Sequence, residues 1–158
     1  MEIILFVSGL IIGMILVGII VWLSMPHMML VRHESRYNSV EETCNQLKVA
    51  IESNGWQCPA IRNMNMAMEE QGVKMEKQVR IVELCNAKYA KDILTTNPEV
   101  STLMPCAWGI YKEKDGKVYI SGMNMGLMGK MFGGNIAKVM GSLVSKDEKQ
   151  ILKDVIRK

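Results

Sequence analysis

The chain has 158 residues, of which 49% are apolar, so its length suits one ordinary domain with a proper hydrophobic core. Charged residues make up 22% and the formal net charge is only +3, which argues against a disordered chain. Aromatic residues account for 6% and the basic residues are dispersed, so the composition also argues against a nucleic-acid-binding surface.

The first predicted element is a membrane-spanning helix. Residues Ile3 to Leu23 form a run of 21 residues whose only polar side chain is Ser8, and a helix of that length spans about 31 Å, which matches the hydrocarbon core of a bilayer. Pro26 is expected to end this helix. The start of the sequence lacks the basic residues of a signal peptide, so we interpret 1–25 as an uncleaved single-pass anchor and 26–158 as the attached domain.

The anchor predicts association but leaves the side of the membrane open. Gly9 and Gly13 have the G-x-x-x-G spacing that lets two membrane helices approach closely, although glycine is also common in membrane helices generally. Arg32 and Arg36 follow the span and favour a cytoplasmic domain by the positive-inside rule. The cysteines and methionines favour the extracytoplasmic side, which we prefer for a protein of the bacterial inner membrane.

After the anchor, strands alternate with helices. Ser39 and Glu42 form a capping box, and Asp115-Gly116 is a strong hairpin signal. The sum predicts an α+β fold, a mostly antiparallel sheet covered by helices and preceded by one transmembrane helix. In chain order we expect a strand at 29–34, a helix at 39–55, a strand at 56–61, a short helix or irregular crossover at 63–70, a strand at 79–84, a helix opening at Asn86 and closed by turn residues at 95–98, a hairpin of 105–112 and 117–121, a glycine-rich loop at 122–134, a helical pattern at 136–144 and a final helix capped by Ser145 and Glu148.

Three stretches carry a family resemblance: Val82 to Ala90 (VELCNAKYA), Leu103 to Cys106 (LMPC) and Tyr111 to Val118 (YKEKDGKV). With them, the region from about 30 to 124 resembles the bacterial and archaeal family called domain of unknown function 302. The resemblance implies a small α+β domain, often dimeric, found alone or attached to exported and membrane proteins. It implies no catalytic residue, and this sequence departs from the family pattern after Gly122, where the resemblance implies a tail with fewer methionines.

Methionine is the compositional outlier, with 15 residues, of which several cluster in two segments expected to be irregular, at 64–68 and 123–131. Met123, Met125 and Met128 belong to the second cluster, and thioether sulfur is a soft ligand that suits Cu(I). The sequence therefore suggests the hypothesis of a copper site in this segment, with Cys85 and Cys106 as further ligands. The alternatives are that these methionines fill gaps in the core or bind a partner, or that the glycine-methionine segment dips into the lipid interface.

The four cysteines, at 44, 58, 85 and 106, include no C-x-x-C pair, which excludes zinc-ribbon, thioredoxin-like and c-type haem motifs. Cys85 ends one predicted strand and Cys106 begins another, so the two are expected to meet at one edge of the sheet. That arrangement suits buried free thiols, a disulfide, or a soft-metal or redox site.

Catalysis has little support in the sequence. No nucleophile elbow, phosphate-binding loop or H-E-x-x-H motif is present, and acidic residues such as Asp147 and Glu148 are expected on caps and polar faces. His27 and His33 are interpreted as juxtamembrane surface residues, with a metal or haem-ligating role as the alternative. We therefore expect a membrane-anchored, non-enzymatic binding or accessory module, a homodimer or a small subunit of a larger membrane complex. The alternative is a Cu(I)- or haem-binding protein.

Overall fold

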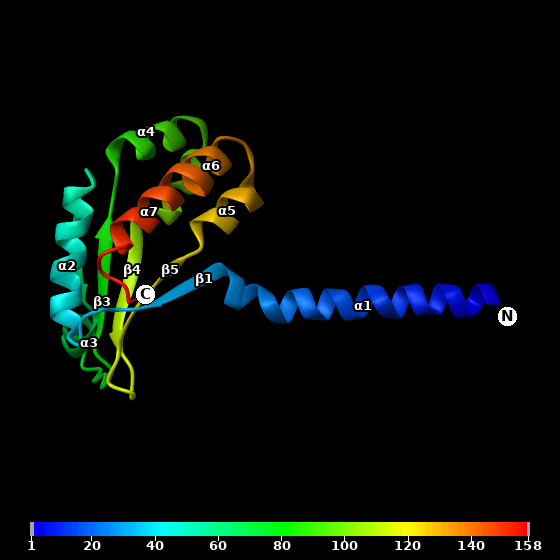
Figure 1. Ribbon diagram of the computed structural model, residues 1–158, viewed down its shortest axis with the longest axis horizontal. Helices are drawn as coiled ribbons and strands as arrows, with labels where there is room; N and C mark the ends of the chain where they lie inside the picture. Colours follow the sequence, from blue (N-terminus) through cyan, green and yellow to red (C-terminus); the bar gives the residue numbers. More distant parts are fainter. Residues whose placement is uncertain (1, 158) are drawn as a thin grey trace.

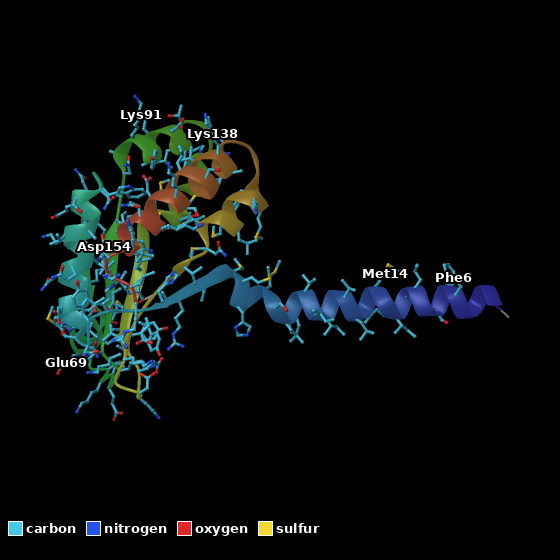
Figure 2. All side chains as sticks on the ribbon, in the orientation of Figure 1. Phe6, Met14, Glu69, Lys91, Lys138 and Asp154 are labelled. Carbon is cyan, nitrogen blue, oxygen red and sulfur yellow. The ribbon has the colours of Figure 1, made fainter. Side chains whose placement is uncertain are left out.

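The N-terminal helix α1 (Glu2–Met29) projects away from the rest of the chain (Figure 1). In the computed structural model, which describes residues 2–157, its stretch Phe6–Met25 is the one helix long and apolar enough to cross a membrane. None of that stretch is buried inside the protein. Figure 2 shows Phe6 and Met14 on the part of the helix that lies clear of the domain.

The helix does not end at Pro26, as the sequence suggested, but runs on to Met29. The last turn is held from outside the helix. The backbone N–H of Asn124 donates to the Met29 carbonyl at 2.8 Å, and the Asn124 side-chain amide donates to the Met28 carbonyl at 3.0 Å. These bonds satisfy carbonyls that a helix end leaves without partners, so the turn after Pro26 persists despite the lost backbone donor.

One antiparallel sheet organises the domain, and its strand order is β1-β5-β4-β3-β2. The predicted hairpin is confirmed, with Gly116 in the left-handed conformation (φ +80°) that the turn requires. The strand expected at 56–61 is wrong, since Gln57 makes only an isolated bridge to Cys85 and the strand lies further on. The strands are β1 (Leu30–Glu34), β2 (Ile61–Asn63), β3 (Val79–Leu84), β4 (Cys106–Lys112) and β5 (Val118–Met123).

The helices of the domain confirm the α+β class. Ser39 and Asn86 accept backbone N–H bonds at the helix starts where the sequence placed them, and α2 contacts β3, β4 and α7. The helical elements are α2 (Val40–Ser53), α3 (Met64–Glu69), α4 (Ala87–Thr96), the 3₁₀ helix η1 (Pro98–Leu103), α5 (Met125–Phe132), α6 (Gly134–Lys138), the π-helical segment η2 (Val139–Val144) and α7 (Ser145–Leu152).

One face of the sheet is buried in the core and the opposite face is not. Val82, Leu84, Ile110 and Ile120 alternate along their strands and are buried in the core. On the opposite face the guanidinium of Arg32 lies 3.6 Å from the ring centroid of Tyr119, a cation–π contact. The covered face therefore positions the buried groups of the domain, and the opposite face carries a polar and aromatic surface.

The segment after Gly122 is more regular than the sequence indicated. The expected loop at 122–134 contains the helix α5 and only the first residue of α6, and Gly129 and Gly141 let α5 and η2 approach until their backbones nearly touch. The expected capping box at Ser145 is also wrong, because α7 continues from η2 with no side-chain cap. The backbone is already helical there, so the N–H groups of α7 have carbonyl partners behind them.

Candidate functional site: a thiol-lined cavity

Cys85 and Cys106 lie at the junction of β3, β4 and α4. Leu84 is the register partner of Cys106 across the two strands, so Cys85 lies one residue beyond that pair. The next residue, Asn86, caps α4 by accepting from the backbone N–H groups of Lys88 (3.1 Å) and Tyr89 (3.3 Å). The strand end and the helix cap thus hold Cys85 in place, and the predicted meeting of the two cysteines is confirmed.

Both thiols border one small cavity of about 30 Å³. That is the space of about one water molecule or one metal ion, and far below the several hundred Å³ of a typical cofactor pocket. The residues around it therefore do not fit a haem. Most of the lining residues are apolar or contain sulfur, and the lining consists of Trp56, Leu84, Cys85, Asn86, Tyr89, Ala90, Ile93, Met104, Pro105, Cys106, Met140 and Val144.

The thiols are unpaired, and one of them is strongly held in its protonated form. All four cysteines are free. Burial raises the pKa of the Cys106 thiol to about 12, with the neighbouring Glu148 and Cys85 adding to the rise. A thiol with such a pKa carries almost no thiolate at neutral pH, so Cys106 is not an activated nucleophile. A bound soft cation would displace its proton.

Two successive acidic residues at the start of α7 meet two tryptophans next to this cavity. The indole N–H of Trp56 and the hydroxyl of Tyr89 each donate to Asp147 Oδ2 at 3.1 Å. Glu148 is only 9% exposed, which contradicts the expectation that it sits on a polar surface. Burial raises the pKa of Glu148 to about 7, and a hydrogen bond from the Trp108 side chain opposes part of that rise.

The structure divides the five predicted metal ligands into two groups. Cys85 and Cys106 line the cavity, whereas Met123, Met125 and Met128 do not. Met123 ends β5 opposite Leu30, and the other two methionines are buried in α5. Met125 and Met128 therefore occupy positions that core packing alone explains.

The thioethers at the cavity are Met104 and Met140, which sequence reasoning passed over as ligands. Met104 precedes Pro105-Cys106 in a stretch that carries the family resemblance, and nothing in that pattern indicates a ligand. Met140 repeats with the apolar residues of a helix, so its pattern predicts burial and gives no sign of what it meets. In residues 2–157 no three His, Cys, Asp or Glu side chains gather in an arrangement that could hold a metal, and His27 (in α1) and His33 (in β1) lie on different elements.

These features define the class of protein: an α+β domain built on one antiparallel sheet, with a thiol-lined cavity under its helices and an apolar helix in front. The chain belongs to the family described as Domain of unknown function DUF302, whose family model matches residues 31–157. The match extends through the tail beyond Gly122, so the expectation that the likeness ends there is wrong.

A solved structure supports the same architecture. The chain is similar to an uncharacterized conserved DUF302 protein from Bacillus stearothermophilus, with a TM-score of 0.70 and 20% sequence identity. The similarity covers 80% of this chain and 98% of the other, and at that identity it shows the fold alone. No curated protein matches the chain significantly.

Proposed function

We propose that this protein is a membrane-anchored, non-enzymatic binding or accessory module, acting as a homodimer or as a small subunit of a larger membrane complex in a bacterial inner membrane. One observation carries the proposal: the apolar stretch Phe6–Met25 has no part buried against the domain. Exposing that much apolar surface to water costs far more than a folded domain of this size can offset. Lipid, with or without another membrane helix, is the environment that removes the cost.

Introducing charged residues into the apolar span tests whether α1 anchors the protein in a membrane. The paired changes Ile12→Arg and Val17→Arg place two arginines near the middle of the span, where each costs about 2.5–3.5 kcal/mol of insertion free energy. We expect the unaltered chain to stay in the membrane pellet after alkaline carbonate extraction and the double variant to appear in the supernatant. Val49→Arg with Val73→Arg adds the same charge on exposed domain positions and should stay in the pellet. Release of the unaltered chain by carbonate would contradict the anchor.

The association part of the proposal has a separate measurement. Native mass spectrometry of the full chain released from nanodiscs should report a dimer or a complex with other subunits. A monomer alone at the concentrations found in cells would refute association and leave the anchor intact.

A second candidate function, Cu(I) binding, is favoured by a specific arrangement. Cys85, Cys106, Met104 and Met140 all face one ion-sized cavity, and thiolate with thioether sulfur is a soft donor set that suits Cu(I). Coordination would release the thiol protons. The donor set differs from the one predicted from the sequence. The thioethers beside the two cysteines belong to Met104 and Met140, and not to Met123, Met125 and Met128.

The two donor sets separate in a Cu(I) competition titration on the reduced full chain in detergent. If the cavity is the site, Cys85→Ser with Met140→Leu should abolish stoichiometric binding, since neither new side chain offers a sulfur ligand. The triple change Met123→Leu, Met125→Leu and Met128→Leu should retain binding. The reverse result would assign the metal to the methionine cluster, and the absence of binding by the unaltered chain would refute a copper function.

A further inference from the structure

The C-terminal end of α5 carries an exposed apolar pair on the side of the domain from which α1 leaves. Met131 is 54% exposed and Phe132 is 55% exposed, and the chain then turns through Gly133 and Gly134, both with positive φ. Figure 1 shows α5 and the turn after it on that same side of the domain. We call Lys130–Gly134 the α5 tip.

The α5 tip is fixed close to the C-terminal end of α1. The hydrogen bonds of Asn124 to the Met28 and Met29 carbonyls join the beginning of α5 to the end of α1, and β1 pairs with β5 from Leu30 opposite Met123 onward. Asn124 also caps α5 by accepting from the backbone N–H of Leu127 at 3.1 Å. One residue therefore couples the direction of α5 to that of the anchor.

The α5 tip lies at a distance from α1 that allows its side chains to contact the membrane surface. An eight-residue helix is about 12 Å long, so the α5 tip lies within about that distance of Asn124. The four residues from Met29 back to Met25 rise about 6 Å toward the membrane. Side chains at the α5 tip can thus reach the headgroup region, where interfacial segments bury their apolar faces to about 5–10 Å.

The charge around the α5 tip is of the right sign for a bilayer containing anionic lipids. Between Asp115 and Asp147 the chain contains no acidic residue, and its ionisable groups include Lys130 and Lys138, both exposed. Exposed apolar residues flanked by lysine are the composition of interfacial membrane segments. A protein partner would need neither these lysines nor the position beside the anchor.

We propose that Met131 and Phe132 insert into the lipid headgroup region beside α1 and hold the domain against the bilayer as a second membrane contact. The proposal rests on the anchoring of α1 in the membrane. It sets the orientation of the domain, because a rigid body fixed to a surface at two points cannot turn freely. The β4–β5 hairpin tip would then be held away from the lipid.

The test places an environment-sensitive fluorescent amino acid at position 132 of the full chain, in vesicles of phosphatidylethanolamine and phosphatidylglycerol. Nitroxide-labelled lipid, with the nitroxide near the headgroup, should quench the emission. Position 73 is the matched control, because Val73 is 56% exposed but lies in the turn after α3, at the far end of the sheet from α5 (Figure 1). A label at 73 should keep its emission.

Each outcome decides the proposal. Equal, weak quenching at both positions, in protein that resists carbonate extraction, overturns the second contact and leaves the anchor standing. A label at 132 shielded from lipid by another copy or another subunit overturns it in favour of a protein interface. Carbonate release of the unaltered chain removes the anchor and this proposal together.

A variant pair checks the result without a label. Met131→Ser with Phe132→Ser changes exposed side chains only, so the fold should persist, and hydrogen exchange at the amides of the α5 tip should rise in vesicle-bound protein. Val49→Ser, at an exposed position of α2, should leave that exchange unchanged. Identical exchange of the α5 tip in the variant and the unaltered chain would contradict insertion.

Discussion

Glu148→Gln is expected to stabilise the protein by about 3 kcal/mol at pH 8 and to leave its stability nearly unchanged at pH 4.5. Burial raises the pKa of Glu148 from an ordinary value of 4.5 to about 7 in the folded protein. The folded protein therefore holds a proton on this group over a pH range in which the unfolded chain has lost it. The protonated Glu148 carboxyl therefore contributes stability that is fully present below about pH 4.5. This contribution is lost as the pH rises through about 7.

The magnitude follows from the size of the shift. One pKa unit corresponds to 1.36 kcal/mol, so a rise from 4.5 to about 7 costs the folded state about 3 kcal/mol once the carboxylate is charged. Glutamine has nearly the same shape, keeps a carbonyl oxygen as a hydrogen-bond acceptor, and is never charged. The variant should therefore show a flatter dependence of stability on pH than the unaltered protein.

The measurement is urea unfolding of the full chain in a mild detergent, followed by near-ultraviolet circular dichroism between pH 4.5 and 8. The quantity of interest is the difference in the free energy of unfolding between variant and unaltered chain, which isolates Glu148 from every other titrating group. Asp154→Asn removes one exposed acid on the same segment and should change stability by less than about 0.5 kcal/mol. A pH-independent difference for Glu148→Gln would show that folding does not raise the pKa of Glu148.

Gly129→Ala is expected to destabilise the protein by about 2 kcal/mol, although alanine is the better helix former. A Cβ at position 129 would lie 2.5 Å from the backbone nitrogen of Gly141 and 3.3 Å from the Cα of Ala137. Backbone atoms cannot rotate aside as a flexible side chain can, so α5 and η2 must separate and lose packing. Overpacking costs about 1–3 kcal/mol, and a contact this short with rigid backbone belongs at the upper end of that range. Subtracting the gain of about 1 kcal/mol from helix propensity leaves a net loss of about 2 kcal/mol.

Gly126→Ala is the matched control within the same helix. Its Cβ would approach Asn124 Oδ1 and Ser145 Oγ at 3.5 Å, which is ordinary van der Waals contact. The propensity term then acts without a clash, and the variant should be as stable as the unaltered chain or more stable by up to about 1 kcal/mol. If urea unfolding gives the two variants equal stability, close approach between α5 and η2 is not what requires a glycine at 129.

These two predictions concern the part of the chain that sequence reasoning described least well. Glycines at 126, 129, 133 and 134 were interpreted as a flexible loop, because isolated glycine lowers helix propensity. Gly129 instead serves a close backbone contact with a helix that follows 12 residues later in the chain. Helix propensity does not include contacts with a partner helix, so the glycine pattern alone predicted a loop where the structure has α5.

The same reasoning explains the partial success with the candidate site. The meeting of Cys85 and Cys106 was predictable because each marks the end of a strand and antiparallel neighbours bring such ends together. The identity of the other cavity residues was not predictable, since Met140 reaches the cavity from a helix beyond the hairpin. The burial of Glu148 was missed for a related reason: an acidic residue near a helix start is usually a solvated partner of the helix dipole.

The sequence by itself determined the features that depend on neighbouring residues. These are the long apolar helix, the capped starts of α2 and α4, the β4–β5 hairpin and the α+β class, because apolar periodicity, caps and turns act over a few positions. Only the tertiary structure decided which methionines border the thiol cavity, that Glu148 is buried, that α5 packs on η2, and that Asn124 joins α5 to α1. Each of these depends on contacts between segments far apart in the chain, and no local pattern encodes where such segments meet.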